Sequence, residues 1–141
     1  MKEGEIGLGD ILRGTSFIST SFGKVTSMRQ STGSRKGMIY KIGNDWYFAD
    51  EIEHDWWREL EAIMGKQHPI GDNYSEYYYK EPITLQWKRE RYKAEGVYFK
   101  QNYRVVCSSI STGEVIEIPI YDLRDYTLEK LVRQYKKEHI V

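Results

Sequence analysis

Apolar and polar residues alternate loosely near the start of the chain, in the pattern of short β-strands. From Ile11 to Val25, β-branched and aromatic residues alternate with Ser and Thr, and Gly14 and Gly23 interrupt the run. A period of two broken by glycine is typical of strands joined by turns. We therefore predict a strand, a turn and a second strand in this region.

Two further strands are predicted around a tight turn. Residues 38–42 and 46–48 are rich in β-branched and aromatic side chains, and residues 43–45 between them read Gly-Asn-Asp. Gly and Asn tolerate the backbone conformations that hairpin turns require. The chain up to residue 48 thus predicts an antiparallel β-meander.

A helical repeat follows the predicted meander. Apolar residues recur at helical spacing over residues 51–64, and Asp50 and Glu53 have the spacing of a capping box. Glycine commonly ends a helix because it adopts the left-handed conformation at low cost. We predict a central helix over residues 51–64 that Gly65 ends.

The second half of the chain predicts another sheet. Residues 65–82 are rich in Gly, Pro and Tyr and are predicted to form a connector. Residues 83–92 alternate apolar and polar positions like a half-buried strand, which Gly96 is expected to end. Residues 97–109 and 114–120 are expected to form a hairpin.

An amphipathic helix is predicted at the C-terminal end, starting near Asp125 or Thr127. Its apolar positions repeat at i, i+3, i+4 and i+7: Leu128, Leu131, Val132 and Tyr135. The predicted class is α+β: antiparallel meander, central helix, second antiparallel sheet and C-terminal helix. We expect a single domain over residues 1–141, with halves 1–64 and 83–141 joined by connector 65–82. Whether the two sheets form one continuous layer stays open.

Charge and cysteine content narrow the functions to consider. The chain has 21 basic and 21 acidic residues, so a nucleic-acid surface would have to be a local patch. Cys107 is the only cysteine, which excludes an internal disulfide and a thiol-rich metal site. His54, His68 and His139 are scattered without ligand spacing. We expect no catalytic residues, no metal and no cofactor.

The opening Met-Lys-Glu-Gly-Glu lacks the features of a secretory signal, because it contains acidic residues and no apolar run follows it. Apolar runs elsewhere are far shorter than the roughly 18 to 20 residues of a membrane span. We therefore expect a cytoplasmic protein without a membrane partner.

The glycines and strands of the first half resemble those of SH3-like small β-barrels. The resemblance covers residues 7–53. It rests on Gly-Asp at 9–10, Gly-Lys-Val at 23–25, a glycine-bounded hairpin, and an aromatic strand ending in acidic residues at 46–51. Such barrels usually bind peptides or nucleic acids and are seldom enzymes, so the resemblance implies a binding scaffold. A plain antiparallel sheet explains the same residues.

Residues 17–22, Phe-Ile-Ser-Thr-Ser-Phe, resemble the Ser-Thr-Ser strand of ADP-ribosyltransferases, which implies turnover of a nicotinamide dinucleotide. That family also has an Arg strand well upstream, whereas Arg13 lies only six residues before Ser19. Glu51-Ile52-Glu53 has the spacing of the family's Glu-x-Glu motif but also fits the start of a helix. An ordinary polar strand is the favoured interpretation.

The polar segment 27–37 is predicted to be a loop and is a candidate phosphate site. Its Gly, Ser and Thr residues expose backbone N–H groups, and Arg29, Arg35 and Lys36 add positive charge. The spacing of a Walker loop is absent. A solvated hairpin loop is the competing interpretation.

A second candidate surface interleaves aromatic and basic residues, as strands that contact nucleic acid do. Its candidate residues are Trp87, Arg89, Arg91 and Arg104. The three strands and helix expected from residue 83 onward are also similar in order to AP2-type DNA-binding domains, such as integrase arm-binding modules. A half-solvated sheet face is the competing interpretation.

Tyrosines and tryptophans supply the remaining candidates. Tyr77, Tyr78 and Tyr79 lie in a tyrosine-rich run that could line a ligand pocket or pack over the core. Trp56 and Trp57 point about 100° apart on a helix, so one of them should lie outside the core. We take Trp57 as a candidate interface residue.

Together these features predict a non-catalytic intracellular binding protein that acts through aromatic and basic surface. Its small size and lack of enzyme motifs are typical of accessory or inhibitor proteins of phages or mobile elements, an analogy only. The expected partner is a protein or a small anionic ligand, and a second copy of the chain stays open. The alternatives are a nucleic-acid-binding module and, second, an ADP-ribosyltransferase-like enzyme.

Overall fold

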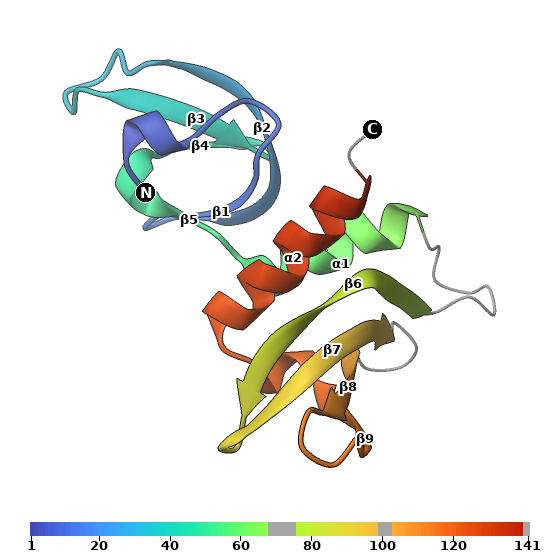
Figure 1. Ribbon diagram of the computed structural model, residues 1–141. Helices are drawn as coiled ribbons and strands as arrows, with labels where there is room; N and C mark the ends of the chain where they lie inside the picture. Colours follow the sequence, from blue (N-terminus) through green and yellow to red (C-terminus); the bar gives the residue numbers. More distant parts are fainter. Residues whose placement is uncertain (68–75, 99–102, 140–141) are drawn as a thin grey trace. The chain divides into compact units, whose positions relative to one another are not determined.

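The computed structural model describes residues 1–67, 76–98 and 103–139 (Figure 1). The chain divides into two compact units, unit 1 (Met1–Asp55) and unit 2 (Trp56–Val141). Each unit contains one antiparallel sheet, and both α-helices belong to unit 2. The α+β class and the predicted order of sheet, helix, sheet and helix are confirmed. The boundary between units lies before the first helix, not at the predicted connector.

Unit 1 is a five-stranded antiparallel sheet in the order β4-β3-β2-β1-β5. Its strands are β1 (Ile11–Thr15), β2 (Thr20–Gln30), β3 (Met38–Ile42), β4 (Asp45–Phe48) and β5 (Ile52–Glu53). A 3-10 turn, η2 (Ala49–Glu51), joins β4 to β5, and another, η1 (Glu3–Glu5), precedes β1. The last strand therefore returns to pair with the first.

The long strand β2 makes this arrangement possible. It pairs with β1 through Thr20 to Lys24 and with β3 through Val25 to Gln30, and its register shifts between Val25 and Ser27. Such an irregularity bends a strand and increases its twist, so one strand can serve two directions of pairing. The core inside the sheet consists of Ile6, Leu12, Val25, Tyr40, Ile42, Tyr47 and Ile52.

Two turn predictions in unit 1 are wrong. The turn between β1 and β2 lies at Ser16–Ser19, where Ser16 Oγ accepts from the N–H groups of Ile18 and Ser19, and not at a glycine. The predicted loop 27–37 begins too early, because β2 continues to Gln30 by pairing with β3. The Ser16 hydroxyl satisfies the backbone N–H groups of the first turn, so no glycine is needed there. Pairing with β3 extends β2 to Gln30.

The predicted start of the central helix is also wrong. Ile52 pairs with Gly14 of β1 and is buried, so this segment completes the sheet of unit 1. The Glu51 carboxylate accepts from the Phe48 N–H at 2.8 Å and thus caps a 3-10 turn. The helix α1 spans Trp56–Gln67, past the glycine expected to end it. Tertiary pairing outweighed the helical spacing of Ile52.

Unit 2 is a four-stranded antiparallel sheet in the order β6-β7-β8-β9, with both helices on one face (Figure 1). Its strands are β6 (Glu76–Trp87), β7 (Glu90–Tyr98), β8 (Arg104–Ser109) and β9 (Val115–Pro119). A 3-10 turn, η3 (Ile120–Asp122), leads to helix α2 (Asp125–His139), close to the predicted position. The core lies between the sheet and the helices, and includes Leu60, Met64, Leu85, Ala94, Val105, Ile118, Leu131 and Val132.

The strand predicted over residues 83–92 is two strands. The chain reverses at Lys88 and Arg89, so Trp87 pairs with Glu90. β6 also starts at Glu76, inside the predicted connector, because Tyr77 and Tyr79 alternate into the core. The sheet therefore has four strands before α2, where the similarity to AP2-type domains counted three.

The strand expected to end at Gly96 instead passes through it. Gly96 lies inside β7, where a Cβ atom would come within 2.5 Å of the Tyr77 carbonyl oxygen. Glycine is required here because the backbones of β6 and β7 approach closely. It marks a close contact between strands, not an end.

Glu138 ties α2 to β6. Its carboxylate accepts hydrogen bonds from Tyr77 Oη at 2.6 Å, Gln134 Nε2 at 2.7 Å, and the N–H groups of Lys80 and Glu81 at 2.8 and 3.0 Å. Burial by itself raises the Glu138 pKa, but these hydrogen bonds outweigh it and lower the pKa to about 2. The ionised carboxylate therefore stabilises unit 2.

A Glu138→Gln variant should be less stable than the wild type by about 1 kcal/mol at neutral pH, a value kept small because the site is partly exposed. A carboxylate whose folded pKa lies below its ordinary 4.5 contributes fully above that pH. The contribution is lost as the pH falls toward 2. Urea titrations from pH 7 to pH 2 should show the two proteins converging.

Glu129→Gln is the matched control for this variant. Glu129 faces Arg133 at 3.5 Å on the surface of the same helix. Exposed pairs of this kind contribute little to stability. A Glu138→Gln deficit that stays constant over the acid range would contradict the assignment.

Candidate functional site

A groove of about 420 Å³ opens beside the β6–β7 turn of unit 2. We call it the hairpin groove. It is lined by Gln86, Trp87, Lys88, Arg89, Asp122, Leu123, Arg124, Tyr126 and Thr127. The turn supplies one wall, and the segment from η3 into α2 supplies the other. Binding sites for small ligands commonly have volumes in this range.

The turn that forms the first wall has an unusual backbone. Lys88 and Arg89 have φ values of 47° and 65°, in the left-handed region. Two-residue hairpin turns with both central residues at positive φ favour Asn-Gly, because other residues pay a steric cost there. This turn places two long cations where Asn-Gly would be less strained. Strain of this kind concentrates at binding and catalytic sites.

Aromatic rings lie on both walls of the groove. Lys88 Nζ sits 4.4 Å from the centroid of the Trp87 ring, and that ring meets the buried Tyr92 ring at 6.3 Å and 62°. The Trp87 ring is thus held by the core on one side. Tyr126, on the α2 wall, is 54% exposed and offers an open ring.

The charges of the groove favour an anion. Three cations, Lys88, Arg89 and Arg124, line it with a single acid, Asp122. The nearby Glu90 does not line the groove; its carboxylate accepts from Ser109 at 2.6 Å and from Ser111 and Tyr92 at 3.2 and 3.1 Å, and it adds one negative charge beside the turn. The Ser109 hydrogen bond is the main cause that lowers the Glu90 pKa.

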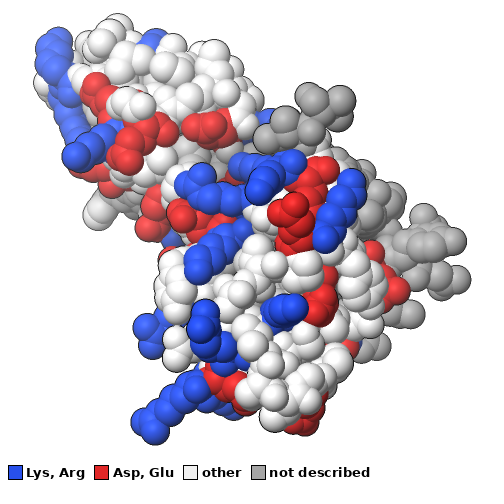
Figure 2. Space-filling view, viewed as in Figure 1, with Lys and Arg blue, Asp and Glu red and all other residues white. Residues whose placement is uncertain are grey.

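Positive charge continues from the turn along β7. Arg91 and Lys93 are exposed on the face of β7 opposite Tyr92 and Ala94, which belong to the core. They are two residues apart and so point to the same side of the sheet. In Figure 2, basic side chains project at the lower left, where Figure 1 places the β6–β7 turn, while charges elsewhere on this face are mixed.

The other candidates in unit 2 lie outside the hairpin groove. Arg104 pairs with Glu117 at 3.0 Å beside the Tyr98 ring. Tyr77 and Tyr79 are buried, their hydroxyls donating to Glu138 and to the Leu131 carbonyl, so of the predicted tyrosines Tyr78 alone is exposed. Residue 74 lies outside the described residues.

Both tryptophans of α1 contact the core of unit 2. Trp56 and Trp57 are partly buried against it, and the Trp57 ring lies 5.9 Å from that of Tyr103. Neither ring is among the buried core residues, so the expectation that one of the two lies outside the core stays a prediction. The interface role of Trp57 stays a prediction.

The basic candidates of unit 1 do not converge. Arg29 stacks on Trp46 at 4.6 Å, while Arg35 stacks on Phe48 at 4.0 Å and pairs with Asp50 at 2.9 Å. Lys36 is exposed in the β2–β3 connection. The Arg35 charge is paired with Asp50, and no groove that contains these three cations is found in unit 1 among the described residues.

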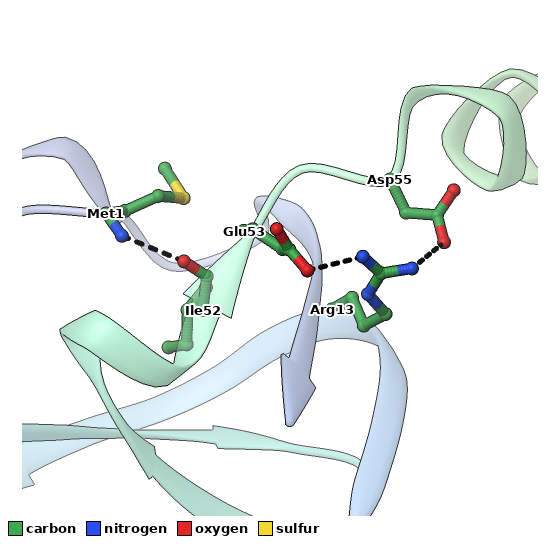
Figure 3. Close-up of polar contacts among 5 residues, drawn as sticks. All are labelled: Met1, Arg13, Ile52, Glu53 and Asp55. Atoms are coloured by element: carbon green, nitrogen blue, oxygen red, sulfur yellow. Dashed lines mark hydrogen bonds and ion pairs between the residues drawn. The ribbon is translucent and has the colours of Figure 1, made fainter. Parts of the chain in front are cut away.

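The Ser-Thr-Ser segment and its acidic partner have structural contacts in unit 1. Ser19 and Ser21 hydrogen-bond the hydroxyl of buried Tyr47 at 2.9 and 2.8 Å. Arg13 bridges Glu53 and Asp55, the latter at 2.9 Å (Figure 3). The Met1 ammonium group donates to the Ile52 carbonyl at 2.8 Å in the same view. These groups hold β5 against β1.

Thiol and metal chemistry gain no support within the residues that the structure describes. Burial raises the pKa of the Cys107 thiol to about 12, so it stays protonated and unreactive. Among residues 1–67, 76–98 and 103–139, no group of three His, Cys, Asp or Glu side chains could hold a metal ion. Over the same residues, no helix has the length and apolar character to span a bilayer.

Lys88, Arg124, Tyr126 and Asp122 were not predicted as site residues. Lys88 belongs to the predicted run of aromatic and basic residues from Trp87 to Lys93 but is not among the site residues chosen from it. The α2 wall is over thirty residues away in the sequence, and its contribution follows only from the fold. Of the predicted residues, Trp87 and Arg89 alone line the hairpin groove.

Comparison of the chain with protein-family models, curated proteins and solved structures gave no match. The resemblance of unit 1 to SH3-like barrels therefore stays a prediction; its five strands follow the order β4-β3-β2-β1-β5, with β4 and β5 at the two edges. Function has to be argued from the hairpin groove itself.

Proposed function

We propose that this chain is a non-catalytic binding protein that holds an anionic ligand in the hairpin groove. The observation that carries the proposal is the strained turn that directs Lys88 and Arg89 into a groove also lined by Arg124. Cations grouped in a concave site attract phosphate or carboxylate groups more strongly than the same cations spread over a surface. Asp122 would limit the ligand to positions near the three cations.

The lining of the groove contains no Ser-His or Cys-His pair. It has no Ser, Cys or His in its wall, and Thr127 is almost fully buried. A hydroxyl or thiol nucleophile activated by a neighbouring imidazole is therefore not part of the proposal for this site. For the rest of the chain, the absence of catalytic activity stays a prediction.

NMR titration with three anionic probes tests the proposal: tripolyphosphate, a ten-residue thymidine oligonucleotide and an oligoglutamate peptide. At least one should shift the amide signals of residues 86–89 and 122–127. The double variant Arg89→Gln/Arg124→Gln, which neutralises two cations, should lower the affinity for that probe about tenfold or more. Charge-assisted hydrogen bonds each contribute about 1.5 to 3 kcal/mol.

Lys130→Gln/Lys137→Gln is the matched control, because both lysines are exposed on α2 and neither lines the groove. It should bind like the wild type at equal net charge. The proposal would be refuted if no probe shifts the groove amides, or if both double variants lose the same affinity for the probe.

A protein partner is the second candidate, favoured by the β1–β2 turn. Phe17 and Ile18 are 104% and 87% exposed there, on a turn fixed by the Ser16 hydrogen bonds. Exposed adjacent apolar side chains commonly mark contact surfaces. A partner held this way would leave the groove amides unshifted and would be lost in Phe17→Ser. The cytoplasmic setting and the phage or mobile-element context stay predictions.

A further inference from the structure

We infer that the ligand of the hairpin groove is single-stranded nucleic acid, with a base against the exposed Tyr126 ring and its phosphates on Lys88, Arg89 and Arg124. The inference rests on the proposed function and narrows it to one chemical class. The observation behind it is the placement of aromatic and cationic side chains in one groove.

The aromatic side chains separate nucleic acid from other anions. Bases stack on exposed aromatic rings, a contact worth about 1 to 3 kcal/mol per base. Tyr126 is 54% exposed in a wall that also carries Arg124. An acidic peptide or inorganic phosphate would use the cations and leave this ring unused. A ligand that alternates planar bases with phosphates uses both.

The size of the groove favours a single strand. A volume of about 420 Å³ admits a unit the size of one nucleotide but not a duplex. The bases of a duplex are also stacked on each other and are not available to an aromatic side chain. Duplex binding would also need many phosphate contacts. The chain carries no net charge, so its attraction for phosphate is restricted to this patch.

The strand would leave the groove along β7. Arg91 and Lys93 lie beyond the turn on the solvent face, beside Gln86 and Thr84 of β6 in the register of the sheet. Their spacing of two strand residues, about 7 Å, lets both reach one backbone. Glu90 directly precedes Arg91 and keeps its negative charge, because the hydrogen bond from Ser109 lowers its pKa, so the cations around it outnumber this acid rather than escape it.

Fluorescence anisotropy with labelled oligonucleotides tests the inference. The probes are a ten-residue thymidine strand, an abasic strand of the same length and charge, and a ten-base-pair duplex. The thymidine strand should bind at least tenfold more tightly than the abasic strand. Tyr126→Ala should weaken thymidine binding about five- to tenfold, as loss of one stacked base predicts, and leave abasic binding unchanged.

Tyr121→Ala is the matched control, since Tyr121 is 64% exposed in η3 but does not line the groove. It should bind thymidine like the wild type. Raising the salt concentration should weaken binding, and Arg89→Gln should reduce the log–log slope by about 0.7 if it neutralises one phosphate. Folding of each variant is checked by its amide spectrum.

The two proposals fail in different ways. Equal binding of thymidine and abasic strands, tighter duplex binding, or insensitivity to Tyr126→Ala would overturn the nucleic-acid inference. Tripolyphosphate or oligoglutamate could still bind the groove, and the proposed function would stand. Loss of every anionic probe from the groove would refute both.

Discussion

Replacing Gly14 with alanine is expected to lower the stability of unit 1 by about 3 kcal/mol, near the upper end of typical overpacking costs. A Cβ atom at this position would lie 2.5 Å from Tyr47 Cδ2 and 2.6 Å from Tyr47 Cγ. The ring cannot move away easily, because it is fully buried and its hydroxyl is bonded by Ser19 and Ser21. The β1 backbone would have to shift instead.

Hydrogen exchange measured by mass spectrometry would locate this effect. Amides of β1, β2 and β5 should exchange faster in Gly14→Ala, because β1 pairs with both neighbours. Gly4→Ala is the control, since a Cβ there meets nothing within 4 Å. In a Tyr47→Ala background the Gly14→Ala cost should largely disappear. A full cost in that background would contradict the clash with Tyr47.

Replacing Lys136 with methionine is expected to lower the stability of unit 2 by about 2 kcal/mol. Lys136 Nζ lies 2.5 Å from the carboxylate of Glu59, whose side chain is only 3% exposed. Loss of the cation removes one ion pair of a buried carboxylate; removal of one partner of a fully buried pair costs about 3 to 5 kcal/mol. Lys136 is 50% exposed, so the cost is reduced.

Urea unfolding followed by tryptophan fluorescence measures the effect, with Lys137→Met as the matched control. Lys137 and Glu81 are 71% and 74% exposed and 3.8 Å apart, so their loss should change stability by less than about 0.5 kcal/mol. Adding Glu59→Gln to Lys136→Met removes the buried charge and should restore part of the stability. Equal costs for the two lysine variants would show that the Glu59 pair contributes nothing.

The Lys136 and Glu138 contacts show the limit of what local sequence patterns predict. The α2 face repeats apolar residues over several turns, and helix and sheet order were confirmed in both units. Lys136 and Glu138 instead act through partners 77 and 61 residues away, Glu59 and Tyr77. Nothing in the sequence spacing indicates these pairs, since contact between distant segments depends on how α2 packs.

The candidate site also contains residues that local sequence predicts and residues that only the fold brings together. Trp87 and Arg89 were predicted from an alternation of aromatic and basic residues, which reflects local surface chemistry. The turn that strains Lys88 and Arg89 was missed, because their residue types do not favour positive φ and only strand pairing on both sides imposes it. Tyr126 and Arg124 entered the site because η3 and α2 cross beside that turn.

The sequence by itself determined the α+β class, the antiparallel meander, the C-terminal helix and the zero net charge, which requires any surface for anions to be local. These features depend on short-range spacing and composition, which can be read from the sequence without knowledge of the fold. The tertiary structure decided that Ile52 adds an edge strand to the first sheet, that residues 83–92 form a hairpin, and that two walls meet at a groove. Each of these depends on burial or pairing between distant residues, and that free energy exists only once the units are folded.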